Sequence, residues 1–186
     1  MTPSPFLQPH ASAMTLFVTK TLAVTKRLLL PALLLLFAAP LSARDNLGIY
    51  GNWGAFRDAQ VPRCYAIAMA EPSSMQRDHQ PYADVGTWPG KGERGQVHFR
   101  LSRNLGVNAR IVLALGGQRF ALVGGGGDAW SADKRMDAAI VAAMRAAGEM
   151  FVSARDASGR SFSNAYKLEG AATAMDAAAI GCAQAR

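Results

Sequence analysis

The chain has 186 residues, half of them hydrophobic, and a formal net charge of +7. Three of its 20 basic residues, Lys20, Lys26 and Arg27, precede a long apolar run, and without them the net charge is only +4. Much of the basic excess, three of the seven net positive charges, therefore belongs to the N-terminal segment. Residues 44–186 suffice for one domain with a buried core and are too few for two domains of ordinary size.

Residues 1–43 are typical of a secretory signal peptide. The basic residues precede the apolar run Leu28 to Ala39, and small residues follow as far as Ala43. The apolar segment 28–43 has 16 residues, fewer than the roughly 20 that a membrane span requires. We therefore expect cleavage near Ala43, no stable membrane span, and a location in the periplasm or cell envelope of a bacterium. Met1 and Met14 both fit the start of such a signal.

The two cysteines, Cys64 and Cys182, both lie in the region that follows the signal. An even number of cysteines in an exported chain predicts a disulfide, and two cysteines allow one intramolecular pairing. Closing a loop on the order of 100 residues stabilises a protein by roughly 4.7 kcal/mol in the chain-entropy model. The alternative is a pair of buried free thiols, which an oxidising periplasm disfavours.

Most of the remaining chain has the patterns of short strands joined by turns. The strongest alternation is Val97, Phe99 and Leu101 inward against His98 and Arg100 outward. Predicted strands cover residues 47–57, 63–69, 82–88 and 95–103, with hairpins within 109–123, about Gly116-Gly117, and within 149–168. Alternation places Cys64 inward, and Trp53 is interpreted as a core or cap residue.

Two helices are predicted near the C-terminal end. The first has Ser131 as its N-cap and buries Met136, Ile140 and Met144, with Asp133 and Asp137 as ordinary surface charges. The second, alanine-rich helix covers residues 171–182 and ends on Cys182. Its buried face presents Cys182 where an inward-facing strand cysteine can meet it.

Motifs for catalysis or cofactor binding are not found. His79 and His98 have no second histidine or cysteine at metal-ligand spacing. The glycines at 124–127 precede a helix but are followed by Asp128, not by the Gly-Lys-Ser/Thr of a phosphate loop. Neither a Gly-x-Ser-x-Gly elbow nor a Cys-x-x-Cys pair occurs. We therefore predict no metal, no cofactor and no enzymatic activity.

One strand has a basic outer face. Arg94, His98, Arg100 and Arg103 lie on or near that face, with Arg110 and Arg119 expected on an adjoining hairpin. Such a candidate anion-binding patch suits an acidic envelope partner such as a phosphorylated glycolipid or a polyanion. The alternative is an ordinary solvated strand face. Nucleic acid is not expected as a partner, because export removes the chain from it and no aromatic residues interleave with the arginines.

The order of several motifs resembles the invasion-associated locus B family of exported bacterial proteins. The motifs are Tyr50 to Trp53, Arg63 to Ile67, Phe120 to Leu122, Asp128 to Trp130, Asp137 to Met144, Ser158 to Arg160, and Tyr166 to Ala171 leading into Cys182. The resemblance implies a mainly β fold, an antiparallel immunoglobulin-like β-sandwich with one amphipathic helix and a short C-terminal helix. It supplies no catalytic residues. Because the middle strands are richer in alanine and arginine than the usual pattern, a general envelope role is preferred over virulence.

The sequence thus predicts an exported, non-enzymatic accessory or binding protein whose partner is an acidic envelope component or another envelope protein. The alternative is a periplasmic enzyme or enzyme inhibitor with an unrecognised site near Trp88, His98 and Arg100. Convergence of these three side chains on one pocket would favour the alternative. Oligomeric state is not predicted.

Overall fold

The computed structural model describes residues 44–58 and 60–183, so the predicted signal peptide lies outside the described residues. The strands are β1 (Asp45–Tyr50), β2 (Trp53–Asp58), β3 (Arg63–Met69), β4 (Tyr82–Trp88), β5 (Glu93–Arg100), β6 (Ile111–Leu115), β7 (Gln118–Gly125), β8 (Asp128–Trp130), β9 (Glu149–Arg155) and β10 (Ser161–Lys167). The helices are α2 (Lys134–Met144), α3 (Ala171–Ala183) and the short 3-10 helix η2 (Pro89–Lys91).

The strands form one open antiparallel sheet of ten strands in the order β1-β2-β3-β4-β5-β8-β7-β6-β9-β10. This confirms the prediction of a mainly β, antiparallel fold with two helices. Strand β8 pairs with β5 on one side and with β7 on the other, so hydrogen bonding continues across the middle of the sheet. The strand pairing therefore gives one continuous sheet and does not show the two separate sheets of a sandwich.

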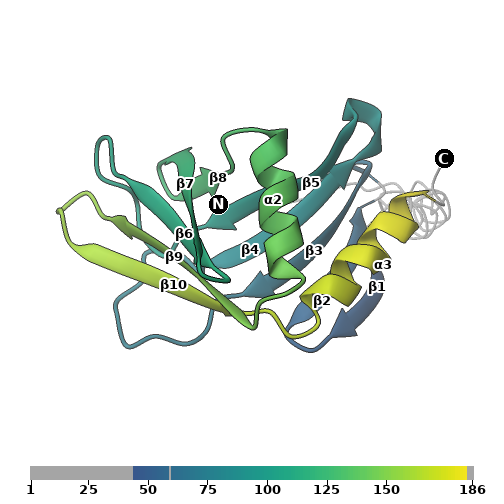
Figure 1. Ribbon diagram of the computed structural model, residues 1–186, viewed down its shortest axis with the longest axis horizontal. Coiled ribbons are helices and arrows are strands. Elements are labelled where there is room, and N and C mark those ends of the chain that lie inside the picture. Colours follow the sequence, from purple (N-terminus) through teal and green to yellow (C-terminus); the bar gives the residue numbers. More distant parts are fainter. Residues whose placement is uncertain (1–43, 59, 184–186) are drawn as a thin grey trace, which may run out of the picture. The chain divides into compact units, whose positions relative to one another are not determined.

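The sheet bends so strongly that its last strand returns to the region of its first strands (Figure 1). The backbone N–H of Glu71 donates to the carbonyl oxygen of Ala165 in β10 at 2.8 Å. The indole N–H of Trp53 donates to the carbonyl oxygen of Lys167 at 2.8 Å, and Trp53 is fully buried, as expected of a core residue. Inside the bend the rings of Phe99 and Tyr166 lie 6.0 Å apart between centroids. The core fills this bend.

The first predicted strand, residues 47–57, is instead a hairpin. β1 and β2 pair antiparallel, and Tyr50 lies opposite Trp53 at the turn. Gly51 adopts a positive φ of 54° there, a conformation that glycine adopts without steric cost. The bulge expected in this segment is present between Asn46 and Gly48. Taking the whole segment as a single strand was therefore wrong, because a tight turn occupies its middle.

The two later hairpins are confirmed. β6 pairs with β7 around Gly116 and Gly117, both at positive φ (57° and 78°), which a two-residue hairpin turn needs. β9 pairs with β10 in unbroken register from Arg155 opposite Ser161 to Glu149 opposite Lys167. Both hairpins turn where the sequence predicts.

Helix α2 begins later than predicted, and one of its carboxylates is buried. Its N-cap is Asp133, whose side chain accepts from the backbone N–H of Met136 at 2.8 Å. Ser131 is not the cap, since its hydroxyl donates to the carboxylate of Asp137. Asp137 also accepts from the backbone N–H of Val97 at 2.7 Å and is only 7% exposed. The prediction of Asp137 as a surface charge was wrong, because it joins α2 to β5.

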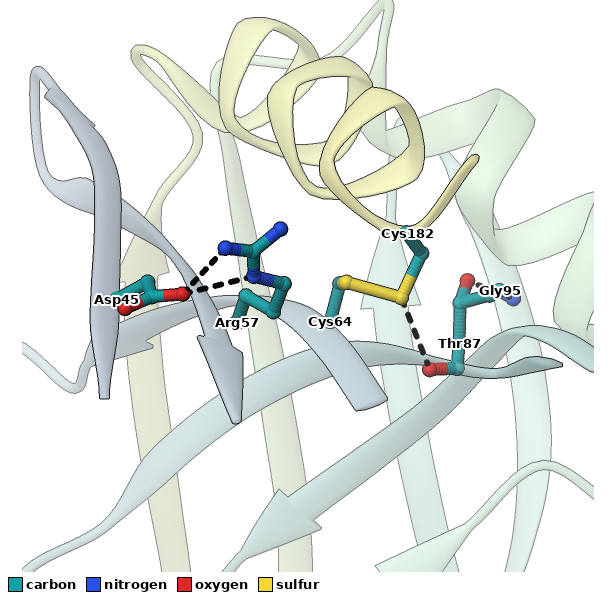
Figure 2. The surroundings of a disulfide bond; sticks show 6 residues. All are labelled: Asp45, Arg57, Cys64, Thr87, Gly95 and Cys182. Atoms are coloured by element: carbon teal, nitrogen blue, oxygen red, sulfur yellow. Dashed lines mark hydrogen bonds and ion pairs between the residues drawn. A yellow bond between two sulfur atoms is a disulfide. The ribbon is translucent and has the colours of Figure 1, made fainter. Parts of the chain in front are cut away.

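The disulfide between Cys64 and Cys182 is present, which confirms the predicted pairing. It links β3 to the end of α3, with the two Cα atoms 5.6 Å apart (Figure 2). Both cysteines are buried, and the sulfur of Cys182 lies 3.9 Å from the carbonyl oxygen of Thr87. Because α3 packs mainly on β1, β2 and β3, the bond fastens this helix to the inner face of the sheet.

Candidate functional site

Polar and aromatic side chains form a row on the outer face of the sheet, opposite to the helices. Successive residues of a strand point to opposite faces, so Tyr65 points outward because Cys64 points inward. The strand register then places Asp84 of β4 opposite His98 of β5, and His98 opposite Trp130 of β8. Three strands thus bring together side chains that are distant in the sequence.

His98 lies between two carboxylates. Its Nδ1 is 2.7 Å from Oδ2 of Asp84, and its Nε2 is 3.1 Å from Oδ1 of Asp128. The other oxygen of Asp128 accepts from Nη1 of Arg100 at 2.6 Å. The imidazole ring also packs against Trp130, with 5.1 Å between centroids. Both ring nitrogens of His98 therefore have partners within the protein.

This environment raises the pKa of His98 above its ordinary value of 6.5. Burial of the ring lowers the pKa, but hydrogen bonding and charge attraction, from Asp84 first and then from Asp128, together outweigh burial. When protonated on both nitrogens, the ring donates a hydrogen bond to each carboxylate. The protonated form of His98 thus holds the two acidic side chains in place.

The raised pKa of His98 predicts that stability falls as the solution becomes alkaline. A histidine whose pKa is higher in the folded state stabilises the fold fully below its unfolded value of 6.5, and this contribution disappears as the pH rises through the folded value. Urea unfolding at a series of pH values from 6 to 9 should show this decline. In His98→Gln, which cannot ionise, the decline should be smaller; an identical pH profile in both proteins would exclude His98 as its source.

Around this row the outer face has a hollow of about 350 Å³, which we name the His98 cleft. Its lining includes Tyr65, Asp84, Trp88, Gln96, His98 and Trp130. The guanidinium carbon of Arg63 lies 4.5 Å from the centroid of the Tyr65 ring and 6.0 Å from that of Trp88. The ring of Trp88 lies over Gly86, where an added Cβ atom would be only 2.5 Å from it. The absence of a side chain at Gly86 therefore allows the ring of Trp88 to pack directly against the backbone of β4.

Two of the three residues named for the enzyme alternative meet at this cleft. Trp88 and His98 converge on it, whereas Arg100 is not among its lining residues and pairs with Asp128. A general base needs a nitrogen that can take a proton from a substrate. Both nitrogens of His98 face carboxylates, so a substrate would have to displace one of these hydrogen bonds to reach the ring.

The four residues of the candidate anion-binding patch do not lie together. Arg94 lines a groove beside the helices, on the other face from His98. Arg100 pairs with Asp128, and Nε of Arg103 lies 2.8 Å from the buried carboxylate of Asp156. Three of the four, His98 included, are therefore already opposite an acidic side chain.

Other arginines gather on the outer face of β6, β7, β9 and β10, and we name this surface the arginine face. It is a shallow hollow of about 530 Å³ whose polar lining is Arg110, Arg119, Arg155, Ser153, Ser161 and Ser163. All six side chains are exposed. Within residues 44–58 and 60–183, none of the three arginines makes an ion pair, and no acidic residue lines the hollow.

Several of these residues have no signature in the sequence. Asp84 and Asp128 are single acidic residues in short segments, and only the strand register shows that both face His98. Arg155 lies in the last hairpin, and its proximity to Arg110 depends on the pairing of β6 with β9. The alternating pattern of β4 could have placed Asp84 on the outer face, since Ala83 and Val85 point inward.

Within the described ranges, no helix is long and apolar enough to cross a membrane, and no group of three or more potential ligands could hold a metal ion. Comparison with known proteins finds no matching family model, no similar curated protein and no similar solved structure.

Proposed function

We propose that this protein is an exported, non-enzymatic binding protein of the bacterial cell envelope, and that it binds an acidic envelope component through the arginine face. The observation that carries the proposal is the gathering of Arg110, Arg119 and Arg155 around a hollow whose lining contains no acidic residue. Export is supported by the signal-like N-terminal segment and by the Cys64–Cys182 disulfide, because such bonds persist in oxidising compartments.

The arginine face suits extended anions. Guanidinium groups bind phosphate and carboxylate oxygens in a bidentate manner, and serine hydroxyls add neutral donors between them. Ser153 and Ser163 lie opposite each other on β9 and β10, with their hydroxyl oxygens 3.0 Å apart. The short side chains between the arginines let a ligand approach the sheet closely.

The resemblance to the invasion-associated locus B family supports the same envelope role. An immunoglobulin-like sandwich is part of this proposal. It is supported by the bend of the sheet, which brings the inner faces of β5 and β10 into contact at Phe99 and Tyr166.

The second candidate is an enzyme or enzyme inhibitor that acts through the His98 cleft. The convergence of Trp88 and His98 on that cleft favours it. The occupied ring nitrogens of His98 and the pairing of Arg100 with Asp128 count against it. We therefore place binding of an acidic partner first.

Replacing Arg110, Arg119 and Arg155 together by glutamine should weaken binding of polyphosphate about tenfold at low salt, since an exposed ion pair contributes about 0.5 kcal/mol. Fluorescence anisotropy with labelled polyphosphate measures the affinity, and raising the salt to about 0.15 M should reduce the difference. The matched control replaces Arg44, Lys91 and Arg135, which are also exposed and lie elsewhere. An equal loss in both triple variants would show that net charge alone causes binding and would contradict the proposal.

A further inference from the structure

A groove runs along the inner face of the sheet between α2 and α3. Helix α2 packs mainly on β5, and α3 packs mainly on β1, β2 and β3, so β4 lies between the two helices (Figure 1). The inward side chains of β4, Val85 and Thr87, therefore line this groove. Its volume is about 460 Å³, within the range of about 300–1,000 Å³ that is usual for small-molecule sites. We name it the α2–α3 groove.

One face of each helix lines the groove with small apolar side chains. On α2 the apolar lining positions are 138, 141 and 142, and on α3 they are 175, 178, 179, 182 and 183. Spacings of three and four place each set on a single helix face. Ala138 and Ala142 are exposed on α2, and Ala179 is exposed on α3. The groove stays open because alanine is too short to close the space between the helices.

The length and lining of the groove fit a single hydrocarbon chain. Helix α2 has 11 residues, and at a rise of 1.5 Å per residue it is about 16 Å long. The disulfide and Met175 continue the apolar lining on the α3 side. An extended hydrocarbon chain laid between the helices would cover the exposed alanines Ala138, Ala142 and Ala179, whose apolar surface is otherwise open to water.

The rim of the groove is basic. Arg94, Lys134 and Arg145 belong to its lining, which contains no acidic residue. Lys134 pairs with Glu93 at 2.9 Å, and Arg145 pairs with Asp176 at 2.7 Å. Within the described residues Arg94 has no ion pair, so its guanidinium is the group free to bind a ligand's charge.

From the apolar lining and this charge we propose that the α2–α3 groove binds a free long-chain carboxylate, with its hydrocarbon chain between the helices and its carboxylate at Arg94. The site is separate from the arginine face and does not depend on the proposed function. Burial of the ligand's hydrocarbon chain provides affinity. The charge of Arg94 favours the carboxylate over an uncharged molecule of equal length.

Isothermal titration calorimetry of the folded protein with dodecanoate and with dodecan-1-ol tests the inference. Dodecanoate should bind about tenfold more tightly than the alcohol, because a charge-assisted hydrogen bond to Arg94 forms only with the carboxylate. Arg94→Gln should remove this difference, whereas Arg135→Gln, an exposed charge outside the groove, should preserve it. Ala142→Leu should weaken both ligands by filling the groove, and leucine is well tolerated in helices.

The matched control for the groove is Ala139→Leu, since Ala139 is exposed on α2 and does not line the groove. Circular dichroism confirms that each variant is folded. No saturable binding of dodecanoate, an equal affinity for the alcohol, or an equal effect of Ala139→Leu and Ala142→Leu would each overturn the inference. None of these results would alter the polyphosphate test of the arginine face.

Discussion

Replacing Cys64 and Cys182 together by alanine is expected to lower the free energy of unfolding by about 4.7 kcal/mol, the value for a closed loop on the order of 100 residues. The two cysteines are separated by 118 positions. The bond acts mainly on the unfolded chain, whose conformational freedom it reduces. Since small domains are stable by only about 5–15 kcal/mol, the variant should be close to unfolding at room temperature.

Urea denaturation followed by circular dichroism measures this loss. Wild-type protein treated with a reductant is the control, because it loses the cross-link but keeps both side chains in the core. The reduced wild type and the double variant should have similar midpoints, and the reductant should not affect the variant. If oxidised and reduced wild-type protein unfold at the same urea concentration, the bond does not stabilise the domain.

Asp137→Ala is expected to lower the free energy of unfolding by about 3 kcal/mol, because a hydrogen bond to a charged group contributes about 1.5–3 kcal/mol and a buried donor is left without a partner. The buried carboxylate of Asp137 accepts from the backbone N–H of Val97 and from the hydroxyl of Ser131. Its removal leaves the N–H of Val97 unsatisfied inside the protein. It also removes the polar link that holds α2 on β5.

Asp133→Ala is the matched control, because Asp133 carries the same carboxylate four residues earlier and is exposed. Loss of this N-cap should cost about 1 kcal/mol. Ser131→Ala should likewise cost about 1 kcal/mol, since it removes one of the two donors to Asp137. Chemical denaturation of the three variants compares them directly, and a loss in Asp137→Ala no larger than in Asp133→Ala would refute the buried link.

Much of the fold could be predicted from local patterns. The alternation in residues 63–69 and 95–103 placed Cys64, Val97 and Phe99 inward, and all three are buried. The glycine pair at 116–117 identified a hairpin because its turn requires positive φ. The short strand β8 was missed, because three residues after a run of glycines carry no periodic pattern.

What local patterns could not supply is the pairing of distant segments. β8 lies between β5 and β7 and so makes the sheet continuous. The periodicity of hydrophobic residues does not predict this pairing. The two carboxylates that contact His98 come from β4 and β8. Of the arginines predicted to share its face, Arg94 lies on the other face of the sheet, and Arg100 and Arg103 pair with acidic residues. Asp137 was predicted to be a surface charge because the spacing of residues along a helix does not show which strand the helix packs on. The backbone N–H of Val97, on that strand, is the donor that keeps Asp137 buried.

Strand β4 forms a wall shared by two sites. Its residues alternate in direction, so Val85 and Thr87 line the α2–α3 groove, while Asp84 and Trp88 line the His98 cleft. A shift of this one strand displaces both sets of side chains at once. The two sites therefore share one backbone: of positions 84 to 88, every one except Gly86 lines the groove or the cleft.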